Sequence, residues 1–278
     1  MVYESRIEAG LRPDGSEAKK DLMHFGPSPL AYDEWAALGI EAPNLARMRE
    51  HRLHRLCAEL EKRDYAGILL TDPVNIRYAS DSTNMQLWIA HNPARACFVS
   101  TDGYILIWDF HNCEHLSDHL PLVKEVRTMT PLFFFESGLM TRTLSEKFAA
   151  EVSEELHRHG GDNRRLAIDK IEWLAGKAIE AKGIEIFEGQ EVTECARLIK
   201  GPDEINAARC SIAACEASVA VLDSHIRPGI SELELWSHLH AENIRRGGEW
   251  IETRIMSSGP RTNPWYQECS ARVLPEGE

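Results

Sequence analysis

The stretch Arg197-Leu198-Ile199-Lys200-Gly201-Pro202-Asp203-Glu204-Ile205 divides the chain into two parts of different character. Pro202 stands where proline is favoured, at the start of a helix, because its missing N–H would have no partner there. Asp203 and Glu204 fall in the first turn, where carboxylates complement the helix dipole. We therefore expect a long helix that runs from this stretch towards His225.

A second helix and a strand are expected after the first helix. Arg227-Pro228-Gly229-Ile230 ends the first helix, and Ser231 with Glu234 forms the pattern of a capping box at the start of the next. Gly247-Gly248 predicts the end of that second helix. The apolar residues of Trp250–Met256 then favour a strand. Residues 196–278 thus form the beginning of a second domain.

Before this stretch, strands and helices alternate, which predicts an α/β domain over 46–195. Asp102-Gly103 lies between two apolar runs and predicts a hairpin. The expected strands are Gly67–Thr71, Arg95–Val99, Tyr104–Trp108, Leu166–Asp169 and Ile184–Phe187, and the expected helices begin at Leu45, Thr143 and Trp173. Residues 1–45 are rich in Gly and Pro with little apolar periodicity, and we expect an irregular arm there.

Composition excludes several classes of function. The formal net charge of −13 argues against nucleic-acid binding, which needs clustered Lys and Arg. No run of about 18 apolar residues predicts a membrane-spanning helix, and the polar N-terminus does not resemble a signal peptide. The seven cysteines form no Cys-x-x-Cys pair, which favours reduced thiols in a cytoplasmic protein.

Four motifs occur in the order and spacing of one enzyme family. They are Asn75-Ile76-Arg77-Tyr78, the dividing stretch at 197–205, Pro228-Gly229-Ile230-Ser231-Glu232, and Ser257-Ser258-Gly259-Pro260-Arg261-Thr262-Asn263-Pro264-Trp265. Together they resemble the creatinase, prolidase and aminopeptidase P family, in which the first motif forms a strand. The resemblance implies a creatinase-type N-terminal α/β domain, followed by the first part of a pita-bread α+β catalytic domain.

Further motifs are similar to one branch of this family, the enzymes that split dimethylsulfoniopropionate into dimethyl sulfide and acrylate. They are Asp81–Trp88, Ala90–Pro93, His240–Ile244, Arg246–Arg254 and Gly259–Trp265. The resemblance implies a metal-dependent lyase that acts on a small zwitterion and forms a homodimer, and the composition predicts no nucleic-acid or membrane partner. The alternatives are an Xaa-Pro peptidase or creatinase-like hydrolase, and a non-catalytic binding protein of the same fold.

Three aromatic residues are candidates for substrate binding: Trp88, Trp265 and Tyr266. By resemblance, Trp88 borders the substrate across the dimer interface, and an indole face suits a sulfonium cation that offers no hydrogen-bond donor. Trp265 follows Pro264, where the related peptidases carry a histidine that stabilises an oxyanion. A tryptophan in place of that histidine favours a β-elimination over hydrolysis. The alternative is that each aromatic residue only packs in a core.

The resemblance places the metal ligands, two aspartates, one histidine and two glutamates, after position 278. Such ligands suit Fe, Mn or Zn, and none is assigned within this chain. We therefore expect the chain alone to bind no catalytic metal and to have no turnover. His111, His115 and His119 have a spacing that would align them on a helix, but a solvated surface helix is the better interpretation.

Overall fold

The structure is a computed structural model that describes residues 26–278. It contains two compact units. One is Asn44–Glu204, and the other joins the described residues up to Pro43 with Ile205–Glu278. The division into 1–45, 46–195 and 196–278 stays a prediction from the sequence.

The unit Asn44–Glu204 is built on a six-stranded mixed sheet in the order β4-β3-β2-β1-β5-β6. The strands are β1 (Gly67–Leu70), β2 (Ala96–Ser100), β3 (Ile105–Asp109), β4 (Val123–Thr128), β5 (Arg165–Ile168) and β6 (Glu185–Glu188). β2 and β3 form the predicted antiparallel hairpin, and β1, β5 and β6 run parallel to one another. The hairpin is confirmed, as are the other strands expected for this unit except the one at Asn75–Tyr78.

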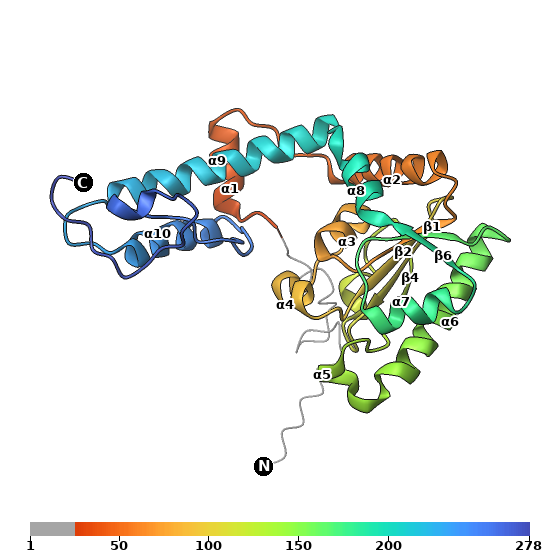
Figure 1. Ribbon diagram of the computed structural model, residues 1–278. Helices are drawn as coiled ribbons and strands as arrows, with labels where there is room; N and C mark the ends of the chain where they lie inside the picture. The colour runs from red at the N-terminus through yellow and green to blue at the C-terminus, as the bar shows by residue number, and fades with distance from the viewer. Residues whose placement is uncertain (1–25) are drawn as a thin grey trace, which may run out of the picture. The chain divides into compact units, whose positions relative to one another are not determined.

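Helices cover both faces of this sheet (Figure 1). α6 (Thr141–Gly160) and α7 (Trp173–Glu180) pack on one face, where Phe148 and Trp108 are fully buried. The other face is covered by α2 (Leu45–Lys62), α3 (Pro73–Ser80) and α8 (Gly189–Leu198). Both faces of the central strands are apolar for this reason, since a strand covered on two sides excludes water from both.

The strand expected at Asn75–Tyr78 is wrong, because these residues belong to helix α3. Asp72 caps the helix, and its carboxylate accepts a hydrogen bond from the backbone N–H of Val74 at 2.9 Å. Pro73 occupies the first helical turn, where its ring fixes the backbone φ angle near the value of a helix. The cap and the proline together start a helix in a sequence whose composition also fits a strand.

The second unit contains α1 (Pro29–Ala37), most of α9 (Pro202–Ser224) and α10 (Glu232–Arg245). The expected irregular arm is wrong for its described part, because α1 is a helix whose Trp35 indole donates a hydrogen bond to the Cys210 carbonyl at 3.0 Å. The first 25 residues of that arm lie outside the described residues. The helices predicted from Pro202 and Ser231 are confirmed, including the capping box.

The strand expected at Trp250–Met256 is wrong for the described structure. Within this segment only Ile255 makes a β-bridge, with Glu268, and no ladder extends from it. A strand forms only where another segment pairs with its backbone, so an apolar run is not sufficient. The short elements α4 (Gln86–His91), α5 (Phe134–Ser137), η1 (Glu114–Leu116), η2 (Gly138–Met140) and η3 (Gly259–Thr262) were not predicted.

Among the described residues, α9 is long and apolar enough to cross a membrane by length and composition alone. A single helix of this kind is weak evidence, since helices of soluble proteins meet the same criterion. The absence of a membrane partner stays a prediction.

Candidate functional site

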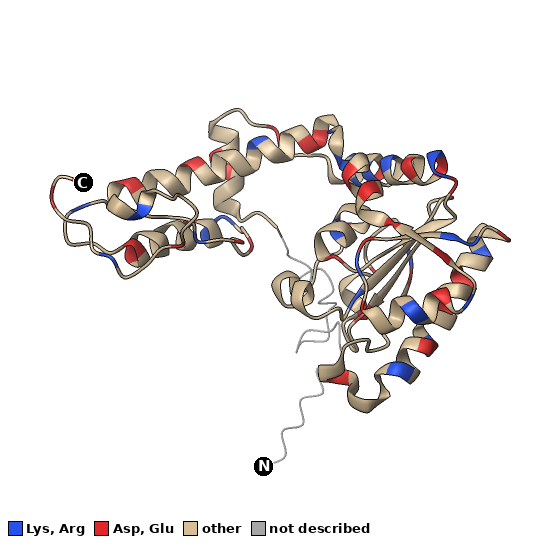
Figure 2. Cartoon of the chain, in the orientation of Figure 1, with Lys and Arg blue, Asp and Glu red and all other residues tan. Residues whose placement is uncertain are grey.

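Trp88 lies on α4, a six-residue helix in the unit Asn44–Glu204. Its ring contacts Phe110 at 5.9 Å and Phe133 at 6.2 Å between centroids, both edge to face. The indole is nevertheless 38% exposed, so Trp88 is not a core residue. Figure 2 shows α4 without any Lys, Arg, Asp or Glu. Trp88 therefore presents an aromatic surface to which a cation or an apolar partner can bind.

A fully buried ion pair lies behind the segment that leads into α4. Arg95 and Asp109 make two hydrogen bonds of 3.0 and 2.9 Å, and neither side chain is exposed to solvent. The Arg95 guanidinium also donates to the Ser82 hydroxyl, and the Asn84 amide reaches Asp109 at 3.5 Å. Because Ser82 and Asn84 immediately precede α4, this network fixes the backbone that carries Trp88.

Asp169 directly follows β5, and its hydrogen bonds connect the end of the neighbouring β1 to helix α3. Its carboxylate accepts hydrogen bonds from the backbone N–H of Thr71 at 2.9 Å and from the Asn75 amide at 2.9 Å. Burial raises the pKa of Asp169 to about 6, although these hydrogen bonds act in the opposite direction. The adjacent Lys170 donates to the carbonyl of Ala90 at the end of α4, 2.9 Å away.

Trp265 and Tyr266 lie together in the second unit, in the loop between Ser258 and Ser270. Their rings are 5.1 Å apart in an edge-to-face arrangement. Both side chains are about 70% exposed, at 68% and 72%, so the alternative that they pack in a core is wrong for this structure. The structure thus brings two of the three predicted site residues together, whereas Trp88 belongs to the other unit.

His111, His115 and His119 do not share a helix face. The only helical turn near them is η1, which spans three residues, so the expected surface helix is wrong. The loop is too short and too irregular to align side chains four residues apart. Among residues 26–278 no group of three or more His, Cys, Asp or Glu side chains is placed to hold a metal ion.

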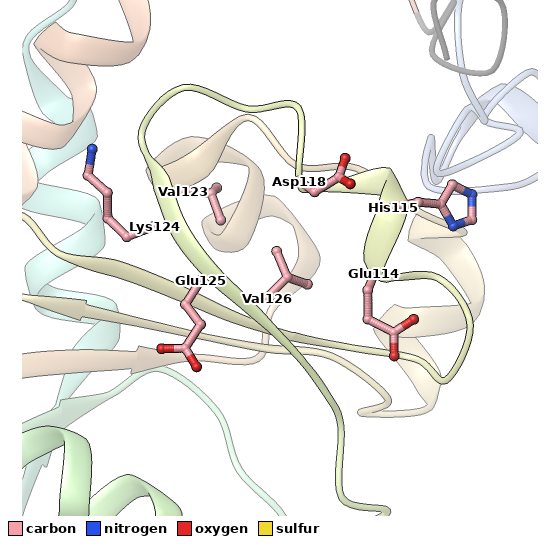
Figure 3. A pocket seen from close by; sticks show the side chains of 7 residues that line it. All are labelled: Glu114, His115, Asp118, Val123, Lys124, Glu125 and Val126. Carbon is pink, nitrogen blue, oxygen red and sulfur yellow. The ribbon is translucent and has the colours of Figure 1, made fainter. Parts of the chain in front are cut away.

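A surface hollow of about 260 Å³ lies beside this loop, against β4. It is lined by Glu114, His115, Asp118, Val123, Lys124, Glu125 and Val126. Figure 3 shows that Lys124, His115 and Glu125 point in different directions and not towards one another. The Glu114 carboxylate is already bonded to the Thr128 hydroxyl at 2.5 Å. The hollow therefore lacks the convergent polar groups of a catalytic site.

All seven cysteines are free. Burial raises the pKa of Cys57 to about 11 and that of Cys97 to about 12. A thiol with a raised pKa is a poor nucleophile at neutral pH, so neither residue resembles a catalytic cysteine.

Arg95, Asp109 and Glu232 support the candidate site but were not predicted from the sequence. Arg95 and Asp109 stand at the ends of two apolar strands, and a charged residue next to a buried strand is a signal that could have found them. Glu232 was noted only as part of a motif. Its contacts are with residues 26 to 38 positions later in the chain, which no local pattern reveals.

Comparison with known proteins shows two close relatives. The chain is 50% identical over 270 residues to the dimethylsulfoniopropionate lyase DddP of Roseovarius nubinhibens, and 47% identical over 270 residues to DddP of Roseobacter denitrificans. Each match covers 95% of this chain and 60% of the relative, so the chain spans about three fifths of their length. No family model matches the chain. The resemblance to the dimethylsulfoniopropionate-cleaving branch is confirmed.

Solved structures confirm the fold. The Xaa-Pro dipeptidase from Bacillus anthracis matches with a TM-score of 0.62 at 20% identity, over 82% of this chain and 58% of that chain. The prolidase from Pyrococcus furiosus matches with a TM-score of 0.61 at 16% identity, over 81% of this chain and 63% of that chain. At these identities the likeness is one of fold alone, and it confirms the expected creatinase and prolidase architecture.

Proposed function

We propose that the protein is a dimethylsulfoniopropionate lyase, a carbon–sulfur lyase that releases dimethyl sulfide and acrylate. The observation that carries this proposal is the 50% identity to a DddP lyase over 270 residues. The prolidase-like neighbours support a hydrolase only weakly, because they are 20% identical or less. Since the chain spans three fifths of its lyase relatives, the proposal concerns the complete protein.

The reaction is a β-elimination. A base removes the proton on the carbon next to the carboxylate, and the electron pair of that C–H bond forms the new double bond. The C–S bond breaks, and its electrons leave on sulfur as neutral dimethyl sulfide. No tetrahedral intermediate forms, so no oxyanion needs to be stabilised beside Pro264, where Trp265 stands.

The complete enzyme is proposed to use Fe, Mn or Zn. Among residues 26–278, no carboxylate and histidine side chains are grouped as ligands for such an ion. This chain would contribute recognition of the sulfonium, and we propose no catalytic residue within it.

Trp265 and Tyr266 are proposed to bind the sulfonium group of the substrate. Their exposed rings stand at 86° to each other, so that two aromatic surfaces adjoin. A sulfonium carries a positive charge but no N–H or O–H, so an aromatic face can attract it without competing for a hydrogen bond. This contact would contribute about 0.5–2 kcal/mol to binding.

A homodimer is proposed, with Trp88 bordering the partner's substrate site. The support is an exposed apolar segment next to Trp88, in which Phe134, Phe135 and Leu139 are all more than half exposed. Phe135 stacks against Phe133, which in turn contacts Trp88. Exposed apolar patches of this kind mark interaction surfaces. We further propose a cytoplasmic location without nucleic-acid or membrane partners.

The test is to supply the complete, metal-loaded protein with dimethylsulfoniopropionate and to measure both products. A lyase releases dimethyl sulfide and acrylate in equal amounts. An Xaa-Pro dipeptide and creatine, offered separately, test the hydrolase alternative. Cleavage of either, without dimethyl sulfide release, would contradict the proposal. A protein that turns over none of these substrates but binds one would favour the non-catalytic alternative.

A further inference from the structure

One carboxylate closes the loop that carries Trp265 and Tyr266. Glu232 Oε1 accepts hydrogen bonds from the backbone N–H of Ser258 at 2.8 Å and from its hydroxyl at 2.7 Å. Oε2 accepts from the backbone N–H of Ser270 at 2.9 Å and from its hydroxyl at 2.7 Å. The two oxygens of a single side chain thus hold the two ends of the loop. We refer to Glu232, Ser258 and Ser270 as the Glu232 clamp.

Glu232 is buried although the loop is not. Glu232 is 1% exposed, whereas Trp265 and Tyr266 at the other end of the loop are largely exposed. Burial alone would raise the pKa of Glu232, but the hydrogen bonds from Ser258 and Ser270 outweigh it and lower the pKa to about 2. The carboxylate is therefore charged at any pH where the protein works. A buried carboxylate that accepts several hydrogen bonds is held rigidly.

Two arginines extend the clamp. Arg261 pairs with Glu232 and donates to the Ser270 hydroxyl at 2.8 Å and to the Glu268 carbonyl at 2.7 Å. Arg272 donates to the Ser258 hydroxyl at 2.6 Å. Each serine hydroxyl therefore donates to Glu232 and accepts from an arginine. These contacts restrict the base of the loop.

We propose that Glu232 is a positioning residue, which closes the loop Ser258–Ser270 at its base and so holds Trp265 and Tyr266 in place for the substrate. Glu232 does not contact the aromatic pair, and it acts through the loop. The inference rests on the proposed function for its kinetic consequence, but its structural consequence is independent of the substrate. A loop that is closed at its base loses less entropy when the substrate orders its tip.

The first test is Glu232→Gln in the complete protein, with hydrogen exchange of residues 258–270 followed by mass spectrometry. The amide cannot accept on both sides, so one end of the loop is released, and we expect exchange there to rise at least tenfold. The matched control is Glu234→Gln. Glu234 lies in the same turn of α10 and accepts from the Ser231 backbone and hydroxyl, but it is no part of the Glu232 clamp. Unchanged exchange in Glu232→Gln would overturn the proposal.

Because Glu232→Gln could unfold the unit, the double variant Ser258→Ala, Ser270→Ala provides a milder test. It removes both hydroxyls and keeps both backbone N–H groups. For this variant we expect faster exchange in the loop, and a KM for dimethylsulfoniopropionate raised about tenfold with kcat changed less than threefold. A positioning role predicts this split, whereas a loss of folded protein would lower kcat and leave KM unchanged.

The two proposals can fail separately. If the wild-type protein releases no dimethyl sulfide but hydrogen exchange in the loop rises in the variants, the proposed function is wrong and the structural role of Glu232 is confirmed. If the wild-type protein is an active lyase and the double variant has the same loop exchange and the same KM, the positioning role is wrong.

Discussion

The two units of the chain are stabilised in different ways. In Asn44–Glu204 a sheet is covered on both faces, and its core includes fully buried Phe148, Leu60 and Ile107. In the other unit, the described residues form one small apolar cluster of Ala31, Trp35, Cys210 and Ala213, with Ile40 packed against it. Large apolar side chains of its helices, including Ile212 and Val219, are about half exposed.

Buried charged contacts add to the few buried apolar residues of the second unit, which also include Ile230 and Leu235. Arg246 is 7% exposed and bonds to Glu34 at 2.7 Å and to Glu242 at 2.7 Å, which connects α1 to α10. The Glu232 clamp likewise joins α10 to the loop that follows it. Removal of one partner from a buried charged contact leaves the other charge buried without compensation, which destabilises the fold strongly. Removal of a buried apolar side chain acts instead through the cavity that it leaves. The comparison therefore predicts a different weak point in each unit.

The largest effect is expected from Phe148→Ala in the sheet unit. Removal of a fully buried aromatic ring leaves a cavity and costs about 3–5 kcal/mol of the free energy of unfolding. Urea denaturation followed by circular dichroism measures the loss. Trp173→Ala is the matched control, because Trp173 is 71% exposed, has no proposed role, and its removal should change stability by less than about 0.5 kcal/mol. Equal effects of the two variants would contradict the proposed difference between core and surface.

Arg246→Met tests the second unit. It leaves Glu242, itself 7% exposed, without a buried partner, and we expect a loss of about 3 kcal/mol. Limited proteolysis should then cleave residues 205–278 before the sheet unit. Lys177→Met is the control, since this lysine pairs with Glu180 on an exposed helix surface and should contribute under about 1 kcal/mol. If Arg246→Met leaves the proteolysis pattern unchanged, charged contacts do not stabilise this unit.

Asp169 makes the stability of the sheet unit depend on pH. Its pKa rises from 3.8 to about 6 on folding, so the folded state binds the proton more tightly. The stabilisation is complete below about pH 3.8 and is lost as the pH rises through about 6. Relative to Asp169→Asn, which does not titrate, the wild type should lose about 2 kcal/mol between pH 4 and pH 7. Denaturation curves at four pH values check this, and a constant difference between the two proteins would be the contrary result.

Signals carried by neighbouring residues allowed most of the fold to be predicted. Asp102-Gly103 predicted the hairpin, and Pro202 and Ser231 predicted the starts of α9 and α10. Asn75–Tyr78 was assigned wrongly, because the cap at Asp72 outweighed the strand-like composition. Trp250–Met256 was assigned wrongly because a strand depends on a pairing segment.

The candidate site could be predicted only in part. Trp88, Trp265 and Tyr266 were chosen from a resemblance and from the chemistry of aromatic rings, and their role stays a prediction. The groups that hold them could not be chosen in this way. Arg95 and Asp109 are 14 residues apart, and Glu232 and Ser270 are 38 apart, so only the folded chain brings each pair together.

The central claim is that exposed tryptophans in both units recognise a sulfonium. The most direct measurement is the KM of the complete protein for dimethylsulfoniopropionate in Trp265→Leu, Trp88→Leu and Trp173→Leu. Trp173 is 71% exposed on α7 and has no proposed role, so it is the matched control. We expect KM to rise about tenfold in the first two variants, which corresponds to about 1.4 kcal/mol, and to stay unchanged in the third. Three variants with the KM of the wild type would contradict the account.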